Sequence, residues 1–458
     1  EARRIPWKPR TQVFGTLDYG RSLGRWSVGY QLSGFHEELL NRGEVLARRF
    51  RPYAFDELHT TRRLSNVFTA SHIIQNRRYL DLTFSHQYFD RIKTTYRKDL
   101  VTLDEQVTAN PAQQDTSRFD HWMARGTYSM NRASTKVNYQ VGYDLNHQTG
   151  WGQRIDEGRQ QMGDYALFTT VEYRPTGRWT LRPGLRAAWN TRYGAPVIPS
   201  LHVRYALTEH WSLRASWADG FRAPDLKELY LYFVDVNHNI VGNPDLQAER
   251  ATNFQGQIAW RRAKGRTLWT WEAVAYHTHL TDRIQLALVD IETLRYTYIN
   301  VGQARTGGGQ TSVGLRTERL SATVGAAWAG LWNPAELRPA GGSAWFFSPE
   351  ASVQLGWRVP KVEVEVNAFL KHNGRVQFYS YISADEIGLS YIDPYSLLDV
   401  NLSRRWWKGR IRTTLGVRNL LDVQNVAAFQ SGGAHTSAAN SLNVGMGRFF
   451  FGGVVLSF

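Results

Sequence analysis

A short stretch of the chain, residues 220–249, holds most of the side chains that could bind a ligand. It reads GFRAPDLKELYLYFVDVNHNIVGNPDLQAE. The imidazole of His238 is a candidate metal ligand, because neutral histidine is the commonest metal-binding side chain. Tyr230, Tyr232 and Phe233 precede it and could stack on a flat or hydrophobic ligand. The ordinary alternatives are a solvated loop histidine and an aromatic belt at a membrane surface.

Arginine supplies a second kind of candidate chemistry. Lys and Arg exceed Asp and Glu to give a formal net charge of +15. The arginines are dispersed along the chain rather than clustered, which disfavours a nucleic acid as partner. Several fall on the polar faces of expected strands, where they could pair with carboxylates or attract an anionic ligand. These are Arg182, Arg186, Arg204, Arg214, Arg412 and Arg418.

Catalytic and metal chemistry find little support in the sequence. The chain has no cysteine, which excludes disulfides and cysteine-based metal sites. Ser431, His435 and Ser437 lie close together, but nothing in their spacing sets them into a catalytic triad. We therefore expect no enzyme, no catalytic residue, no resident metal and no cofactor.

Alternation of apolar and polar residues recurs along the chain, and a period of two residues predicts strands with two different faces. In the segment 179–190, Leu181 and Leu185 lie on one face. Arg182 and Arg186 lie on the other. Such runs reach about ten residues, the length with which a tilted strand crosses a bilayer. Charged residues in mid-strand suit a water-filled interior better than the dry core of a soluble sandwich.

Short turns alternate with long loops, which is the topology of outer-membrane barrels. The long loops include 100–118, 224–248, 374–392 and 425–441. Tryptophans follow three of the short turns, where an aromatic girdle is expected, at Trp26, Trp179 and Trp211. The short turns lie near Gly24, Asn76, Arg132, Gly177, Glu209, Gly265, Arg319, Lys361 and Gly409.

These turns predict an all-β fold, a large antiparallel transmembrane β-barrel with about 19 strands. An odd count puts the first and last strands' free ends at opposite ends of the barrel, whereas bacterial single-chain barrels have even counts. We therefore expect residues 1–458 to be one barrel that lacks its first strands, with residues 1–10 at the outer rim. No run of about 18 apolar residues occurs, and the mean hydropathy is −0.44.

Two boxes in the segment 220–249 resemble those of the TonB-dependent outer-membrane receptors. Phe221, Arg222, Ala223 and Pro224 match the first box, and Asn243, Pro244, Asp245 and Leu246 match the second, with Glu249 behind it. Tyr298-Ile299-Asn300-Val301 with Gly307-Gly308-Gly309 resembles the family's mid-barrel motif. Val417-Arg418-Asn419-Leu420-Leu421-Asp422 resembles its C-terminal end. Because Pro224 lacks an N–H and Asn243 precedes a proline, the simplest interpretation of both boxes is loop architecture.

The resemblance implies a 22-stranded barrel, of which 19 strands would be present, filled by an N-terminal plug domain that is absent here. It implies a receptor that takes up a scarce nutrient, of the haem, iron–siderophore or cobalamin class, across the outer membrane of a Gram-negative-type cell. Its partners would be that nutrient, its own plug, the TonB complex acting through the plug, and outer-membrane lipid with lipopolysaccharide. A passive porin-type channel is the alternative, which would need neither box.

The resemblance also gives His238 a specific candidate role. Haem receptors of the family are similar in placing an iron-ligating histidine on this loop, and imidazole suits haem iron. Haem would then be transported cargo rather than a cofactor. The sequence does not identify the ligand.

Overall fold

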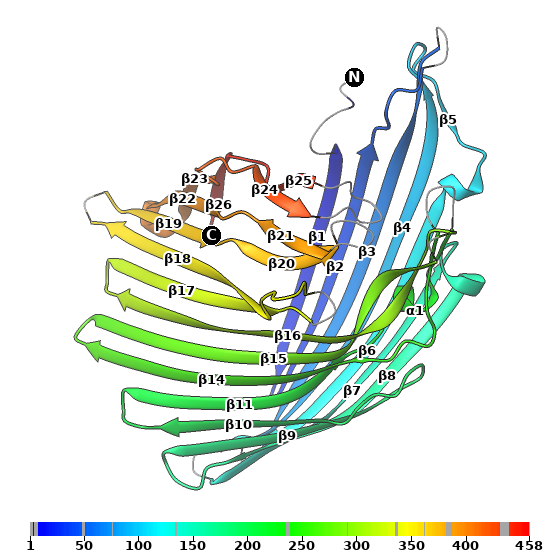
Figure 1. Cartoon of the computed structure of the whole chain (residues 1–458). Helices are drawn as coiled ribbons and strands as arrows, with labels where there is room; N and C mark the ends of the chain where they lie inside the picture. Colours follow the sequence, from blue (N-terminus) through cyan, green and yellow to red (C-terminus); the bar gives the residue numbers. More distant parts are fainter. Residues whose placement is uncertain are drawn as a thin grey trace.

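The protein is described by a computed structural model over residues 3, 8–47, 51–75, 77–132, 135–234, 239–290, 292–334, 338–360, 362–381, 387–430 and 439–457. Most of these residues form strands (Figure 1). The long strands are β1 (Arg10–Leu23), β2 (Trp26–Asn41), β3 (Tyr53–Ile74), β4 (Arg78–Asp99), β6 (Asp115–Met130), β7 (Val137–Gly152), β8 (Arg159–Tyr173), β9 (Trp179–Asn190), β10 (Ile198–Ala206), β11 (Trp211–Arg222), β14 (Glu249–Lys264), β15 (Thr267–Asp290), β16 (Arg295–Arg316), β17 (Leu320–Trp332), β18 (Trp345–Val359), β19 (Val364–Asn373), β22 (Tyr395–Trp406), β23 (Ile411–Arg418) and β26 (Phe449–Leu456).

The remaining elements are short and lie in the connections. They are the strands β5 (Glu105–Val107), β12 (Tyr232–Val234), β13 (Asn239–Val241), β20 (Val376–Tyr381), β21 (Ile387–Ile392), β24 (Asn425–Gln430) and β25 (Ala439–Asn443), the α-helix α1 (Leu226–Tyr230), and the 3₁₀ helices Pro111–Gln113, Asp156–Gly158 and Trp407–Gly409. None of the helices in the described ranges is long and apolar enough to cross a membrane.

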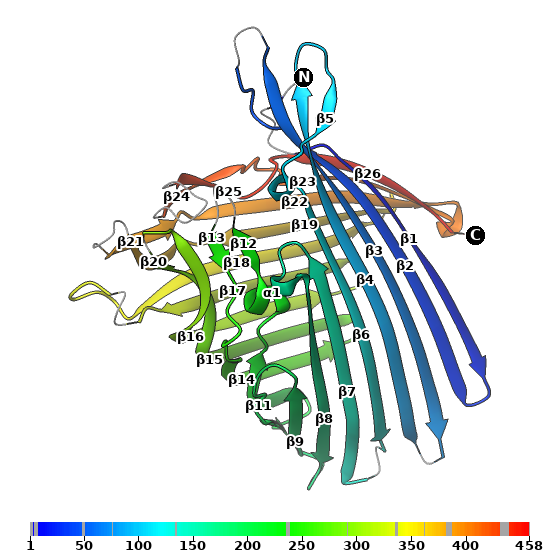
Figure 2. The same cartoon turned by 90° about the vertical axis from the view of Figure 1, so that its right-hand side faces the viewer.

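The long strands form one antiparallel wall in which each pairs with the next one along the chain. Figures 1 and 2 show this wall as strongly curved. It contains nineteen strands within the described residues, so the large antiparallel sheet is confirmed. Over the same residues, β1 pairs with β2, β26 pairs with β23, and no pairing joins β1 to β26.

The nine short turns predicted from the sequence lie at one end of the wall, the inner end, and the long connections lie at the other, the outer end. Gly24 has a φ of +62° in the first short turn, a conformation that favours glycine. Strand β1 runs from the outer end toward that turn, whereas β26 finishes opposite Ile411 at the inner end. The first and last strands therefore have their free ends on opposite sides, as expected.

The two faces of the wall follow the predicted alternation. Leu185 faces outward with 48% of its surface exposed, and it pairs with Pro199 on the same face. Arg186 faces inward and pairs with carboxylates of the inner face. Near the inner end, outward rings form a band in which Trp179 lies 4.6 Å from Tyr205 between ring centroids. This band is the expected aromatic girdle, and it places the apolar outer face in lipid.

Hydrophobic side chains bury one another mainly at the outer end. A compact cluster lies under α1 and contains Ile155, Met162, Leu226, Leu229, Tyr230, Leu246 and Ile284. Its members come from the connections that follow β7 and β11 and from the strands β8 and β15. The core of the protein therefore stabilises the outer loops, while the wall depends on its strand pairing.

Candidate ligand site at the outer mouth

The connection between β11 and β14 begins with a tightly capped helix. The side chain of Asp225 accepts hydrogen bonds from the N–H groups of Lys227 and Glu228, both at 2.8 Å. Glu228 in turn accepts the N–H of Asp225 at 2.9 Å, which completes a capping box. Pro224 is fully buried just before it. We call the described residues of this connection, 223–234 and 239–248, the platform; Figure 2 shows α1 beside the outer ends of β6, β7 and β8.

Arg222, at the end of β11, ties the platform to the wall. Its guanidinium donates to Glu228 at 2.9 and 3.0 Å and to Glu249, the first residue of β14, at 2.9 Å. Glu249 also accepts the N–H of Ile284 at 2.7 Å. Burial alone would raise the pKa of Glu249, but the hydrogen bonds from Arg222 and Ile284 lower it below its ordinary value. The hydrogen bonds that Arg222 donates to Glu249 and Glu228 raise the pKa of Arg222.

The second box closes the platform against β15 and β16. Asn243 donates to the carbonyl of Tyr298 at 2.9 Å and accepts the N–H of Asp245. Asn300, of the mid-barrel motif, exchanges two hydrogen bonds with the backbone of Gln247 and donates to the carbonyl of Asp282. The motifs that are far apart in the sequence therefore meet at one place, where they fix a loop.

The remaining box residues lie around this contact. Leu246 is buried in the outer cluster, Phe221 and Ala223 are half-buried, and Pro244 and Asp245 are exposed. The contacts of both boxes are those expected of loop architecture.

The three predicted aromatic residues occupy different environments. Tyr230 is only 9% exposed and packs in the outer cluster, with the guanidinium of Arg192 5.3 Å from its ring. Phe233 is half-buried, with the guanidinium of Arg154 3.7 Å from its ring centroid. Tyr232 is 52% exposed. The structure thus leaves Tyr232 as the aromatic with most surface for a ligand, and its role in binding stays a prediction.

His238 lies outside the described residues. Its neighbours on the chain are placed, because β12 and β13 pair with one another and β13 pairs in parallel with β16, Ile240 opposite Tyr296. Asn239 donates to the carbonyl of Thr293 at 3.0 Å. The haem-ligand assignment for His238 is therefore a prediction that the structure does not address.

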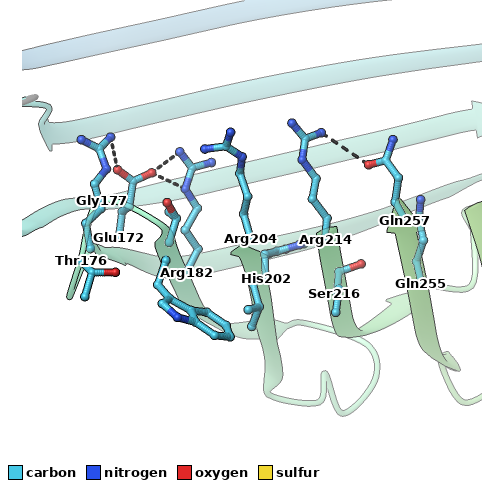
Figure 3. Close-up of a pocket in the computed structure, with 15 residues that line it drawn as sticks. Glu172, Thr176, Gly177, Arg182, His202, Arg204, Arg214, Ser216, Gln255 and Gln257 are labelled. Atoms are coloured by element: carbon cyan, nitrogen blue, oxygen red, sulfur yellow. Dashed lines mark hydrogen bonds and ion pairs between the residues drawn. The ribbon is translucent and has the colours of Figure 1, made fainter. Parts of the chain in front are cut away.

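A second group of polar side chains lines the inner face near the inner ends of β8, β9, β10, β11 and β14 (Figure 3). They surround a concavity of about 870 Å³. Glu172 forms ion pairs with both Arg174 and Arg182, whereas Arg214 donates to Gln257 at 3.5 Å. The inward placement predicted for the arginines of β9–β11 is confirmed here. Sequence reasoning missed Glu172 and Arg174, which the even-numbered inward face of β8 and the turn after it would have indicated.

Comparisons with known proteins agree with this architecture. The family model described as TonB dependent receptor-like, beta-barrel matches residues 6–420. An iron-regulated outer membrane virulence protein of Vibrio cholerae is 28% identical over 122 residues, which are 26% of this chain and 18% of the relative. The vitamin B12 transporter BtuB of Photobacterium profundum is 24% identical over 242 residues, 50% of this chain and 37% of the relative. The chain therefore spans well under half the length of these two relatives.

Among solved structures, the siderophore receptor PirA from Pseudomonas aeruginosa has a similar fold. Its TM-score is 0.65 at 15% sequence identity, over 99% of this chain and 77% of that one. The match of the family model covers most of the chain, and the wall, its outward apolar face and the meeting of the boxes fit it. The chain therefore belongs to the TonB-dependent receptor family, as an outer-membrane β-barrel.

Proposed function

We propose that the protein is an outer-membrane receptor for the energy-dependent uptake of a scarce nutrient. The observation that carries the proposal is the match to the receptor family over residues 6–420. The platform at the outer end supports it, because loop residues fixed by a buried core and an ion-pair network are suited to present a ligand-binding surface.

The names of similar proteins indicate the class of nutrient. They include an iron-regulated protein, a vitamin B12 transporter and a siderophore receptor. We infer cargo of the iron–siderophore, haem or cobalamin class. Tyr232 and Phe233 would contact this cargo, Tyr230 would position the platform from below, and His238 would ligate iron if the cargo is haem.

Family membership also suggests the partners. We infer a plug domain in the interior, the TonB complex acting through that plug, and lipopolysaccharide around the apolar outer face. We infer no catalytic role and no resident cofactor. A passive porin-type channel is less well supported, because the match is to a receptor family and a channel has no need of a fixed platform.

Uptake measurements test the proposal. Cells that lack the gene and cells that express it would be compared for uptake of a ferric siderophore, haemin and cyanocobalamin under limitation of each nutrient. We expect the gene to accelerate uptake of one class, and a protonophore to abolish the gain. An uptake gain that persists with the protonophore would support the passive porin-type channel. The absence of a gain for every nutrient class would overturn the proposal.

His238→Ala refines the result. If haemin is the cargo, this variant should bind haemin more weakly and change its Soret band, because one axial ligand is lost. Asn237→Ala, next to His238 on the chain, is the matched control. Wild-type haemin binding by His238→Ala would show that His238 does not bind iron.

A further inference from the structure

The inner-face concavity of Figure 3 carries an excess of positive charge. Its lining contains Arg174, Arg182, Arg204 and Arg214 but a single carboxylate, that of Glu172. Glu172 is already shared by Arg174 and Arg182. The lining residues therefore carry a net excess of three positive charges, and neither Arg204 nor Arg214 pairs with the one lining carboxylate.

The register of the strands concentrates this excess at one point. Arg204 of β10 lies directly opposite Arg214 of β11. Side chains in that relation have Cβ atoms about 4.5–5.5 Å apart, and like charges so placed destabilise the pair. Arg214 reaches a carboxylate only indirectly, since Gln257 accepts from it and donates to Glu272 at 3.2 Å. Arg204 has no hydrogen-bond or ion-pair partner within the described part of the chain.

The surroundings favour an oxyanion as a partner for these arginines. The guanidinium groups of Arg182, Arg204 and Arg214 extend to the same side of the sheet, away from lipid (Figure 3). Ser216, Gln255 and His202 lie in the adjacent row and offer neutral polar groups. Paired guanidinium groups bind carboxylate or phosphate oxygens with short, charge-assisted hydrogen bonds. An anion bound between two such groups offsets the repulsion between their positive charges.

We propose that Arg204 and Arg214, with Arg182 beside them, form an oxyanion-binding station near the inner end, separate from the platform at the outer mouth. This inference rests on the proposed function. It adds that the interior of the wall holds carboxylate-type anions at this station. Two sources could supply them, an anionic cargo passing through the interior or acidic side chains of a polypeptide segment that occupies it.

A single reporter tests the station directly. The chain has no cysteine, so Thr176→Cys can carry an environment-sensitive fluorophore at the edge of the concavity. Citrate is the probe, titrated into the protein purified from outer membranes. We expect a saturable response that weakens about tenfold or more when Arg204 and Arg214 are both replaced by Gln, since two charge-assisted contacts are lost.

Arg266→Gln is the matched control. It removes one positive charge, where the double variant removes two, from an exposed short turn at the inner end, where Arg266 pairs with Glu318. It should leave the citrate response unchanged.

A photo-crosslinking amino acid at Thr180, which also lines the concavity, separates the two sources. A citrate response in the wild type that weakens in the double variant assigns the station to diffusible anions. No citrate response, together with crosslinking to an acidic polypeptide segment that is lost in the double variant, assigns it to that segment. Equal citrate responses from wild type and double variant, or neither citrate binding nor crosslinking, would overturn the station. Nutrient uptake would still be measured separately, so the proposed function stands or falls on its own test.

Discussion

At the scale of single residues, Arg222 shows why a family box can be structural. Its guanidinium joins α1, the start of β14 and, through Glu249, the backbone of β15. A lysine could not make these contacts together, because it lacks the planar fork that donates in two directions. The box therefore preserves a geometry on which any ligand site of the platform depends.

Replacing Arg222 with Gln should loosen the platform. Charge-assisted hydrogen bonds contribute about 1.5–3 kcal/mol when buried. Arg222 is 45% exposed, so we expect local opening to become easier by only about 1 kcal/mol. Amide exchange across α1 should then be about fivefold faster by mass spectrometry. Arg266→Gln should change nothing there. Unchanged exchange in Arg222→Gln would show that the hydrophobic cluster alone holds α1.

The lowered pKa of Glu249 makes the same contact sensitive to acid. A carboxylate with a lower pKa in the folded state stabilises it fully above the ordinary carboxyl pKa of about 4.3. That stability is lost as the pH falls toward the lowered value. After correction for intrinsic rates, exchange across α1 should stay constant from pH 7 down to about pH 5 and accelerate as the pH falls below about 4.3 in the wild type. Glu249→Gln should show little pH dependence. Identical pH profiles would place the acid-sensitive group elsewhere.

The sequence could predict the box residues but not what they contact. Asn243 and Asn300 are 57 positions apart, and nothing in their spacing shows that both bind backbone of the same fold region. Tyr230 illustrates the same limit. In an irregular loop no periodicity assigns a face, so its burial under Arg192 depends on packing that only the folded chain reveals.

At the scale of elements, the wall was largely predictable because alternation and turn chemistry are local. The nine short turns and the inward and outward faces follow directly from them. The small strands β20, β21, β24 and β25 were not, since they form within long loops, and β21 of one loop pairs with β24 of another. Such pairing has no local signal.

Gly308 tests how closely strands of the wall approach one another. A Cβ there would collide with the carbonyl oxygen of Trp328 and meet the ring of Tyr276. Gly308→Val should therefore destabilise the wall by about 1–3 kcal/mol, the usual cost of overpacking. Thermal unfolding in detergent would measure it. Gly256→Ala is the control, because nothing lies within 4 Å of its added Cβ. Equal stability of the two variants would contradict this account of the glycine motif.

At the scale of the whole molecule, the wall and the outer loops are separable. Strands β23 and β26 pair directly, although β24 and β25 lie between them in the sequence. Replacing residues 425–443 with a short Gly-Ser linker should leave the wall intact, seen as unchanged heat-modifiable migration in gels. If these loops help to retain cargo, uptake should fall. Failure of the variant to insert would show that the loop sheet is needed for the wall.

The pairing of each strand with its neighbour in sequence has a consequence for assembly. The connections within the wall are local, the longest being 223–248 and 419–448. Closing a loop of that length costs little more entropy than closing a short one, since the cost grows only logarithmically. Local pairing of this kind also favours rapid folding over a long-range search. The wall can thus grow by adding one strand at a time to an existing hairpin, and lengthening an outer loop need not disturb the register already formed.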